Sequence, residues 1–166
     1  STNNSSSPPY IQINYVSAKA NSYRSISTNL PNCWRYSMLY NNGTYEPPLS
    51  GLSDENQEAA NRIIYNTQSH LRQNGYPNAT ARAITGWTAP IYDGEYRIAF
   101  RFSVDGGTIT AGNYHFIYEL STGQWAGKYA NQQSWNHGFI NPNLNEVGQW
   151  DAMATSKTYY MAVKLS

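Results

Sequence analysis

This 166-residue chain carries one cysteine and three histidines, the side chains best suited to covalent catalysis. The thiol is Cys33, and the imidazoles are His70, His115 and His137. A thiolate attacks a carbonyl carbon when a neighbouring imidazole takes its proton, and a third polar group can fix the ring in the correct tautomer. These residue types point to acyl transfer through a cysteine nucleophile, a reaction that needs no metal or organic cofactor.

Cys33 lies at the predicted start of a short helix over residues 33–40, which Pro31 precedes and an Asn-Asn-Gly turn ends. Backbone N–H groups at a helix N-terminus stabilise a thiolate, and an adjacent imidazolium lowers the pKa of the thiol further. The Cys33 amide is also placed to donate a hydrogen bond to an oxyanion. We therefore expect a reactive Cys33. The alternative is an inert thiol, because free cysteine is among the most buried residue types.

His115 is the predicted base, because alternation places it on one face of a strand over residues 113–120. The other face of that strand is apolar, and we expect the Cys33 helix to pack on the face that carries His115. His137, in a predicted loop, is the reserve base. His70 lies inside a predicted helix, where a solvated or packing role is expected.

Asn131 is the predicted orienting residue for the imidazole. A Ser-Thr-Gly segment at residues 121–123 has the composition of a three-residue hairpin loop. If the flanking strands pair around that loop, His115 lies diagonally across from Gly127 and Asn131. Gly127 has no side chain, which favours Asn131 and leaves Asn136 and Asp151 as substitutes.

The segment CWRYS, which begins at Cys33, resembles the Cys-Trp-x-aromatic-Ser helix start of papain-like cysteine peptidases. His115 opens a strand as the histidine of that family does, and Asn131 with Ser-Trp at residues 134–135 is similar to its Asn-Ser-Trp segment. The short interval from Cys33 to His115 is closer to compact members of the fold, such as the NlpC/P60-type cell-wall peptidases. The resemblance implies a papain-like core, with N-terminal helices that carry the cysteine packed on an antiparallel sheet that carries the histidine. It also implies a Cys-His-Asn site that cleaves peptide or amide bonds.

The elements that must position these residues run from helices to strands. A second helix is predicted over residues 54–74, with Ser53 as its N-cap. Its buried stripe is predicted to consist of Ala60, Ile63, Ile64, Thr67 and Leu71. Alternation of period two predicts strands over residues 96–104, 113–120, 124–130 and 159–165. This order predicts an α+β domain with helices on one face of an antiparallel sheet.

The length is that of one domain with a core of its own. Residues 1–9 are rich in Ser and Asn, end in Pro-Pro and are expected to form a disordered tail. Residues 10–166 are then predicted to form a single domain that opens with a strand over residues 10–16.

Composition excludes several classes of function. The net charge is +1, from 11 basic and 10 acidic residues, and no basic run occurs, so nucleic acid is not expected as a partner. No apolar stretch is long enough to span a bilayer, so membrane insertion is not expected. The 15 tyrosines and 5 tryptophans, with abundant Asn and few Lys, are typical of exported proteins. We expect a secreted monomer that acts on a peptide or a cell-wall peptide.

The aromatic residues support an alternative to the hydrolase. Exposed Trp and Tyr side chains stack on sugar rings, so the chain could be a non-enzymatic carbohydrate-binding, lectin-like domain, or a toxin module, with Cys33 buried. A sugar-binding β-sandwich would lack the helix over residues 54–74. That helix is therefore the feature of the sequence that discriminates between the two interpretations.

Overall fold

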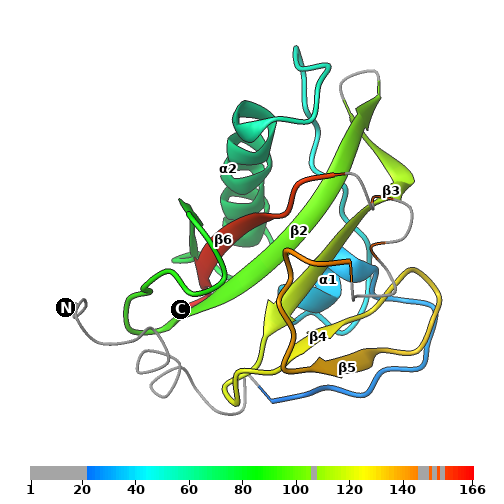
Figure 1. Ribbon diagram of the computed structural model, residues 1–166, viewed down its shortest axis with the longest axis vertical. Coiled ribbons are helices and arrows are strands. Elements are labelled where there is room, and N and C mark those ends of the chain that lie inside the picture. The colour runs from blue at the N-terminus through cyan, green and yellow to red at the C-terminus, as the bar shows by residue number, and fades with distance from the viewer. Residues whose placement is uncertain (1–21, 106–107, 146–149, 151–152, 154–155) are drawn as a thin grey trace.

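The computed structural model describes residues 22–105, 108–145, 150, 153 and 156–166. Its α-helices within these residues are α1 (Cys33–Ser37) and α2 (Gln57–Gln73). The strands are β1 (Thr80–Ile84), β2 (Glu95–Asp105), β3 (Thr108–Glu119), β4 (Trp125–Gly127), β5 (Trp135–Gly138) and β6 (Tyr159–Lys164). All six join one antiparallel sheet in the order β1-β6-β2-β3-β4-β5 (Figure 1). The predicted α+β class, with few helices and an antiparallel sheet, is confirmed.

The long strands β2 and β3 form the centre of the sheet, as their alternation predicts. Ile98 of β2 lies between Tyr118 of β3 on one side and Met161 of β6 on the other. The loop between β3 and β4 has Gly123 at φ +92°, the left-handed conformation expected for this hairpin. Alternation does not reveal β1 and β5, because most of their side chains are half-buried or exposed and neither strand has an apolar face.

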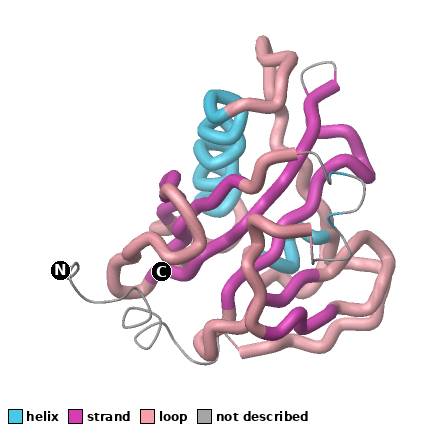
Figure 2. Tube along the Cα trace, in the orientation of Figure 1, coloured by secondary structure: helices cyan, strands magenta, loops and turns pink. Residues whose placement is uncertain are grey.

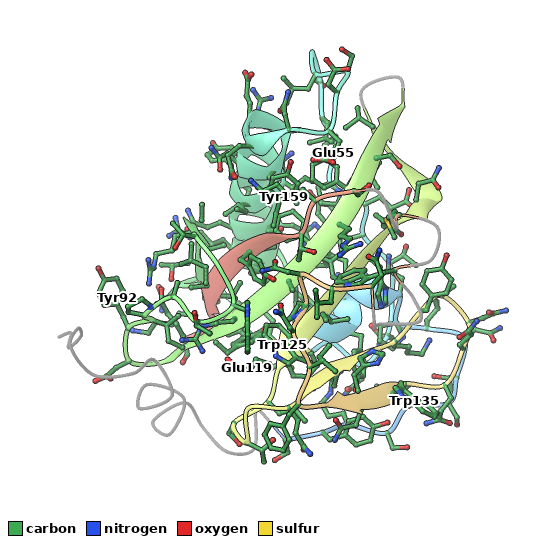
Figure 3. The ribbon with its side chains drawn as sticks, in the orientation of Figure 1. Glu55, Tyr92, Glu119, Trp125, Trp135 and Tyr159 are labelled. Atoms are coloured by element: carbon green, nitrogen blue, oxygen red, sulfur yellow. The ribbon has the colours of Figure 1, made fainter. Side chains whose placement is uncertain are left out.

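The helix α2 begins three residues later than predicted. Asn56, and not Ser53, is its N-cap, and the Asn56 side chain accepts a hydrogen bond from a backbone amide at 2.9 Å. The cause is Glu55, whose carboxylate accepts a hydrogen bond from the Tyr159 hydroxyl and another, at 3.4 Å, from the Lys157 amide (Figure 3). These contacts hold the segment before Asn56 beside the start of β6 and outside the helix. The predicted buried stripe of α2 is confirmed.

The sheet has two buried faces with different covers. The helices α1 and α2 cover the first face, where they pack on the alternating aromatic and aliphatic residues of β2, β3 and β6. Loops lie over the second face, as Figure 2 shows by their colour. There Trp150 is fully buried in a cluster with Ile117 and Trp125. A residue on a strand therefore faces either the helices or the loops, depending on its place in the alternation.

Two buried arginines hold loops on the second face. Arg97 donates through Nη1 to Glu119 Oε1 at 2.7 Å, and through Nε and Nη2 to the Ala89 carbonyl at 2.9 and 2.6 Å. Arg101 donates to the Thr158 hydroxyl at 2.8 Å and to two backbone carbonyls of the loop that precedes β6. Each guanidinium thus ties a strand to a loop on this face.

The predicted tail over residues 1–9, the predicted strand over residues 10–16 and Asp151 lie outside the described residues. No helix in the described ranges combines the length and the apolar character that a membrane span requires.

Candidate functional site

Cys33 is the first residue of α1, as predicted, but its thiol is buried. The Asn32 side chain caps the helix by accepting a hydrogen bond from the Arg35 amide at 3.0 Å. Only 3% of Cys33 is exposed, and burial raises the pKa of its thiol to about 12, with hydrogen bonds from the backbone of Phe116 opposing the rise. A helix of five residues does not offset that burial. Burial therefore disfavours the thiolate that the sequence predicts at neutral pH, and Cys33 lies in the structure as a buried free thiol.

His115 is also fully buried, on the loop-covered face of β3. Its ring meets the rings of Tyr129 and Trp150 edge-on, with centroid distances of 5.3 and 5.6 Å. Burial, together with the neighbouring His137, lowers the pKa of His115 to about 3. Neither ring nitrogen of His115 has a hydrogen-bond partner among the described residues.

The structure does not bring Cys33 and His115 together. The helix α1 packs against Phe116, and its Tyr36 meets the ring of Tyr118 at 5.6 Å, so it covers the apolar face of β3. His115 is on the other face, as the alternation predicts. The prediction that failed is the side on which the helix lies. Because α1 is itself apolar, it buries its aromatic side chains against the apolar face of the strand and leaves His115 to the loops.

The structure also separates Asn131 from His115. Ala130 has a left-handed backbone, with φ 49°, and the chain turns there. Asn131 consequently lines a groove at the N-terminus of α1, on the face that carries Cys33. Among the substitutes, Asn136 is exposed and donates to Gln124 at 3.3 Å.

The two remaining histidines differ in their surroundings. The His70 ring stacks on Tyr45 with a centroid distance of 3.7 Å, and its Nε2 lies 3.1 Å from Arg35 Nη1. His70 therefore has the packing role that was expected. His137 lies in β5, where burial lowers its pKa to about 4, and it acts electrostatically on His115 rather than on Cys33.

This groove has a volume of about 790 Å³. It is lined by Asn29, Leu30, Asn32, Thr44, Tyr45, Glu46, Tyr114, Ala130 and Asn131. We call it the α1 groove. Glu46 is the one charged side chain of this lining, and amides and hydroxyls supply most of the other polar groups.

A hydrogen-bonded chain of three side chains orders one wall of the α1 groove. The Tyr114 hydroxyl donates to Glu46 Oε2 at 2.9 Å and accepts from Asn32 Nδ2 at 3.1 Å. Burial is the main cause that raises the pKa of Tyr114, so the phenol keeps its proton and remains the donor to Glu46. The same Asn32 caps α1 with its carbonyl oxygen, so the helix and the groove wall share one residue.

A buried lysine fixes two segments of the α1 groove relative to each other. Lys128 is 0% exposed, and its ammonium donates to the carbonyls of Asn29 and Ala130 at 3.0 and 2.7 Å. Both of these residues line the groove. The hydrogen bonds from buried Lys128 thus set the spacing between the segment at Asn29 and the segment at Ala130.

The sequence reasoning named Asn131 but missed Glu46 and Tyr114. Tyr114 belongs to the apolar face of its strand by alternation, and nothing in the local pattern indicates that its hydroxyl reaches the surface. The available signal is the position of Tyr114 near the start of a strand whose apolar face meets a helix N-terminus. Glu46 lies in a turn-rich segment, where a single acidic residue has no distinguishing pattern.

Comparisons with family models, with curated proteins and with solved structures find no match to this chain. The similarity to papain-like peptidases is thus a similarity of short motifs in the sequence.

Proposed function

We propose that this protein is a non-catalytic binding protein whose α1 groove takes a neutral carbohydrate. The observation that carries the proposal is the ordered Asn32–Tyr114–Glu46 chain on the wall of an open groove. Binding sites for small polar ligands combine some apolar lining with a few fixed hydrogen-bonding groups. The donors of Asn32 and Tyr114 are used within the protein, so the chain presents the fixed Glu46 carboxylate as an acceptor for sugar hydroxyls. Asn29, Thr44 and Asn131 of the same lining carry side chains that can donate to a sugar.

The aromatic side chains support the same class of ligand. Tyr45 is half-buried, belongs to the groove lining and offers the part of its ring that His70 does not cover to the C–H groups of a sugar. Trp135 is 59% exposed at the outer edge of β5, where Figure 3 labels it. With few charged groups in the groove, a neutral ligand is favoured over a phosphorylated or sulfated one. A secreted location, as the composition predicts, would give such a protein access to extracellular glycans.

The thiol hydrolase implied by the sequence motifs has less support. It requires a proton to pass from the Cys33 thiol to His115, and these residues face opposite sides of the sheet. The support for the papain-like core implied by the same motifs is that both helices precede the strands of the sheet along the chain. The binding function needs neither residue, which makes Cys33 a useful negative control.

The test is a glycan array followed by isothermal titration calorimetry with the best ligand. Tyr114→Phe removes the hydroxyl that orders Glu46, and Glu46→Gln removes the charged acceptor. Each should weaken binding by about tenfold or more, since a hydrogen bond to a charged group contributes about 1.5–3 kcal/mol. Cys33→Ala should leave the affinity unchanged.

Two results would overturn the proposal. One is the absence of any glycan that binds the intact chain. The other is an affinity that Tyr114→Phe and Glu46→Gln leave at the wild-type value while both variants remain folded by circular dichroism.

A further inference from the structure

Two asparagines of this chain are each followed by glycine, a sequence in which the side-chain amide is chemically labile. The pairs are Asn42-Gly43 and Asn74-Gly75. The backbone nitrogen of the following residue can attack the asparagine Cγ, and glycine leaves this approach open because it has no Cβ. Asparagine accordingly belongs to the thermolabile residues of proteins. The structure gives the two pairs different surroundings, so it distinguishes their reactivities.

Asn74 follows the last residue of α2, and the end of that helix holds its polar groups. Its side-chain amide donates to the His70 carbonyl at 2.8 Å, and its backbone amide donates to the Leu71 carbonyl at 3.1 Å. Its own carbonyl accepts a hydrogen bond from the Tyr40 hydroxyl at 2.5 Å. The side chain must leave the helix end before its Cγ can meet the Gly75 nitrogen. These hydrogen bonds therefore protect Asn74.

Asn42 is exposed in the segment that follows α1, and its side chain is not held in this way. Its backbone carbonyl accepts a hydrogen bond from Arg35 Nε at 3.1 Å. In the part of the chain that the structure describes, neither the Asn42 side-chain amide nor the Gly43 N–H has a hydrogen-bond partner. Both reacting groups of this pair are therefore available without the loss of an existing hydrogen bond.

A positive charge lies beside the same pair. A Cβ atom built on Gly43 would lie 3.0 Å from Arg35 Nε and 3.2 Å from Arg35 Nη2, so the guanidinium lies against this glycine. The attacking nitrogen must give up its proton, and the tetrahedral intermediate carries negative charge on the former amide oxygen. A neighbouring cation stabilises both anions. Asn42 thus combines a free side chain with a guanidinium next to the reacting atoms.

We propose that Asn42 is a site of spontaneous deamidation in the folded protein. The Gly43 nitrogen bonds to Asn42 Cγ, and ammonia leaves with the electron pair of the broken C–N bond and with the proton that the Gly43 nitrogen gives up. Water then opens the five-membered succinimide at one of its two carbonyl carbons, which leaves aspartate or isoaspartate at position 42. No oxidant or reductant takes part, and water is the co-reactant.

The modification changes one wall of the α1 groove. The Gly43 carbonyl accepts a hydrogen bond from the Asn32 amide at 3.0 Å, and Asn32 and Thr44 line the groove. Isoaspartate adds one carbon to the backbone before Gly43, so it displaces this anchor of Asn32. Both products add a carboxylate beside Arg35 and lower the net charge of the chain from +1 to zero. The reaction needs no ligand, so it does not depend on the proposed sugar binding.

The experiment is incubation of the intact chain at pH 8, with ion-exchange separation of the acidic product and peptide mapping by mass spectrometry. In the native protein, deamidation at Asn42 should be about tenfold or more faster than at Asn74, because Asn74 must first break two hydrogen bonds. Asn42→Gln should abolish the rapid acidic product, since the longer side chain closes a ring more slowly. Asn74→Gln is the matched control and should form the product at the wild-type rate.

The same incubation in urea separates the effect of the fold from that of the local sequence. Unfolded Asn42 and Asn74 should react at similar rates, because each is followed by glycine. The proposal fails if native Asn42 stays unmodified, if native Asn74 reacts as fast, if Asn42→Gln keeps the rapid product, or if the preference for Asn42 persists in urea. Circular dichroism of each variant verifies that the compared samples are folded.

Discussion

The buried ion pair between Arg97 and Glu119 gives the sharpest stability prediction. The two side chains are 2% and 8% exposed, and Nη1 lies 2.7 Å from Oε1. At that distance and an effective dielectric constant of about 20, the gross attraction is about 6 kcal/mol. Burial nevertheless raises the pKa of Glu119, with Arg97 only partly opposing it, so desolvation of the carboxylate outweighs the attraction. The pair is thus costly to break, but it contributes little net stability.

The perturbation is a double-mutant cycle with Arg97→Met and Glu119→Met. Arg97→Met leaves the Glu119 carboxylate without its opposite charge and the Ala89 carbonyl without the Arg97 donors, and Glu119→Met leaves the Arg97 guanidinium without its opposite charge. Each single substitution should lower the free energy of unfolding by about 3–5 kcal/mol. The double variant should lie within about 2 kcal/mol of the wild type, because a methionine pair of similar volume needs no counter-charge. The remaining cost includes the Ala89 carbonyl, which loses the two hydrogen bonds from Arg97.

The assay is urea unfolding followed by tryptophan fluorescence, since buried Trp125 and Trp150 report on this face of the sheet. Arg62→Met, at an exposed position of α2, is the matched control and should change the free energy of unfolding by less than about 0.5 kcal/mol. The reasoning is refuted if either single substitution costs less than about 1 kcal/mol, or if the double variant loses the sum of the two singles.

Two other predictions follow from buried groups. Cys33 should resist alkylation by iodoacetamide in the native protein from pH 6 to 9 and react once urea unfolds the protein, because burial raises the pKa of its thiol to about 12. Alkylation is measured by mass spectrometry, and rapid reaction of the native protein near pH 7 would contradict the structure. Gly127→Ala should lower the free energy of unfolding, measured with urea, by about 1–3 kcal/mol, because the new Cβ would lie 2.7 Å from Ile117 Cγ2. Gly86→Ala is the control and should cost much less, because its new Cβ would meet no atom within 4 Å.

The sequence predicts the elements in which one physical pattern dominates. The buried stripe of α2 and the alternation of β2, β3 and β6 are each long enough to outweigh local exceptions, and the structure has all four elements. The β5 strand is different: Trp135 and Asn136 are exposed, and the strand exists because it can pair with β4. The local sequence of β5 does not show which strand it will pair with.

The candidate site illustrates a second limit. Alternation correctly predicts that His115 and Tyr114 point in opposite directions, but it does not say which face a helix covers. The apolar character of Trp34 and Tyr36 could have indicated that α1 prefers the apolar face, and with it Tyr114 rather than His115. The left-handed turn at Ala130, which moves Asn131 away from His115, has no such signal, because a left-handed conformation is uncommon for alanine.

The position of β6 in the sheet has a consequence for synthesis on the ribosome. Residues 159–164 occupy a place between β1 and β2, so β1 has no neighbour in the sheet until they emerge. A nascent chain that has already formed the β2–β3 hairpin would expose the other edge of β2, whose Ile98 and Phe100 are fully buried in the finished protein. Exposed strand edges of this kind recruit other strands, so the interval before β6 appears is the one in which chaperones and proteases would compete for the chain.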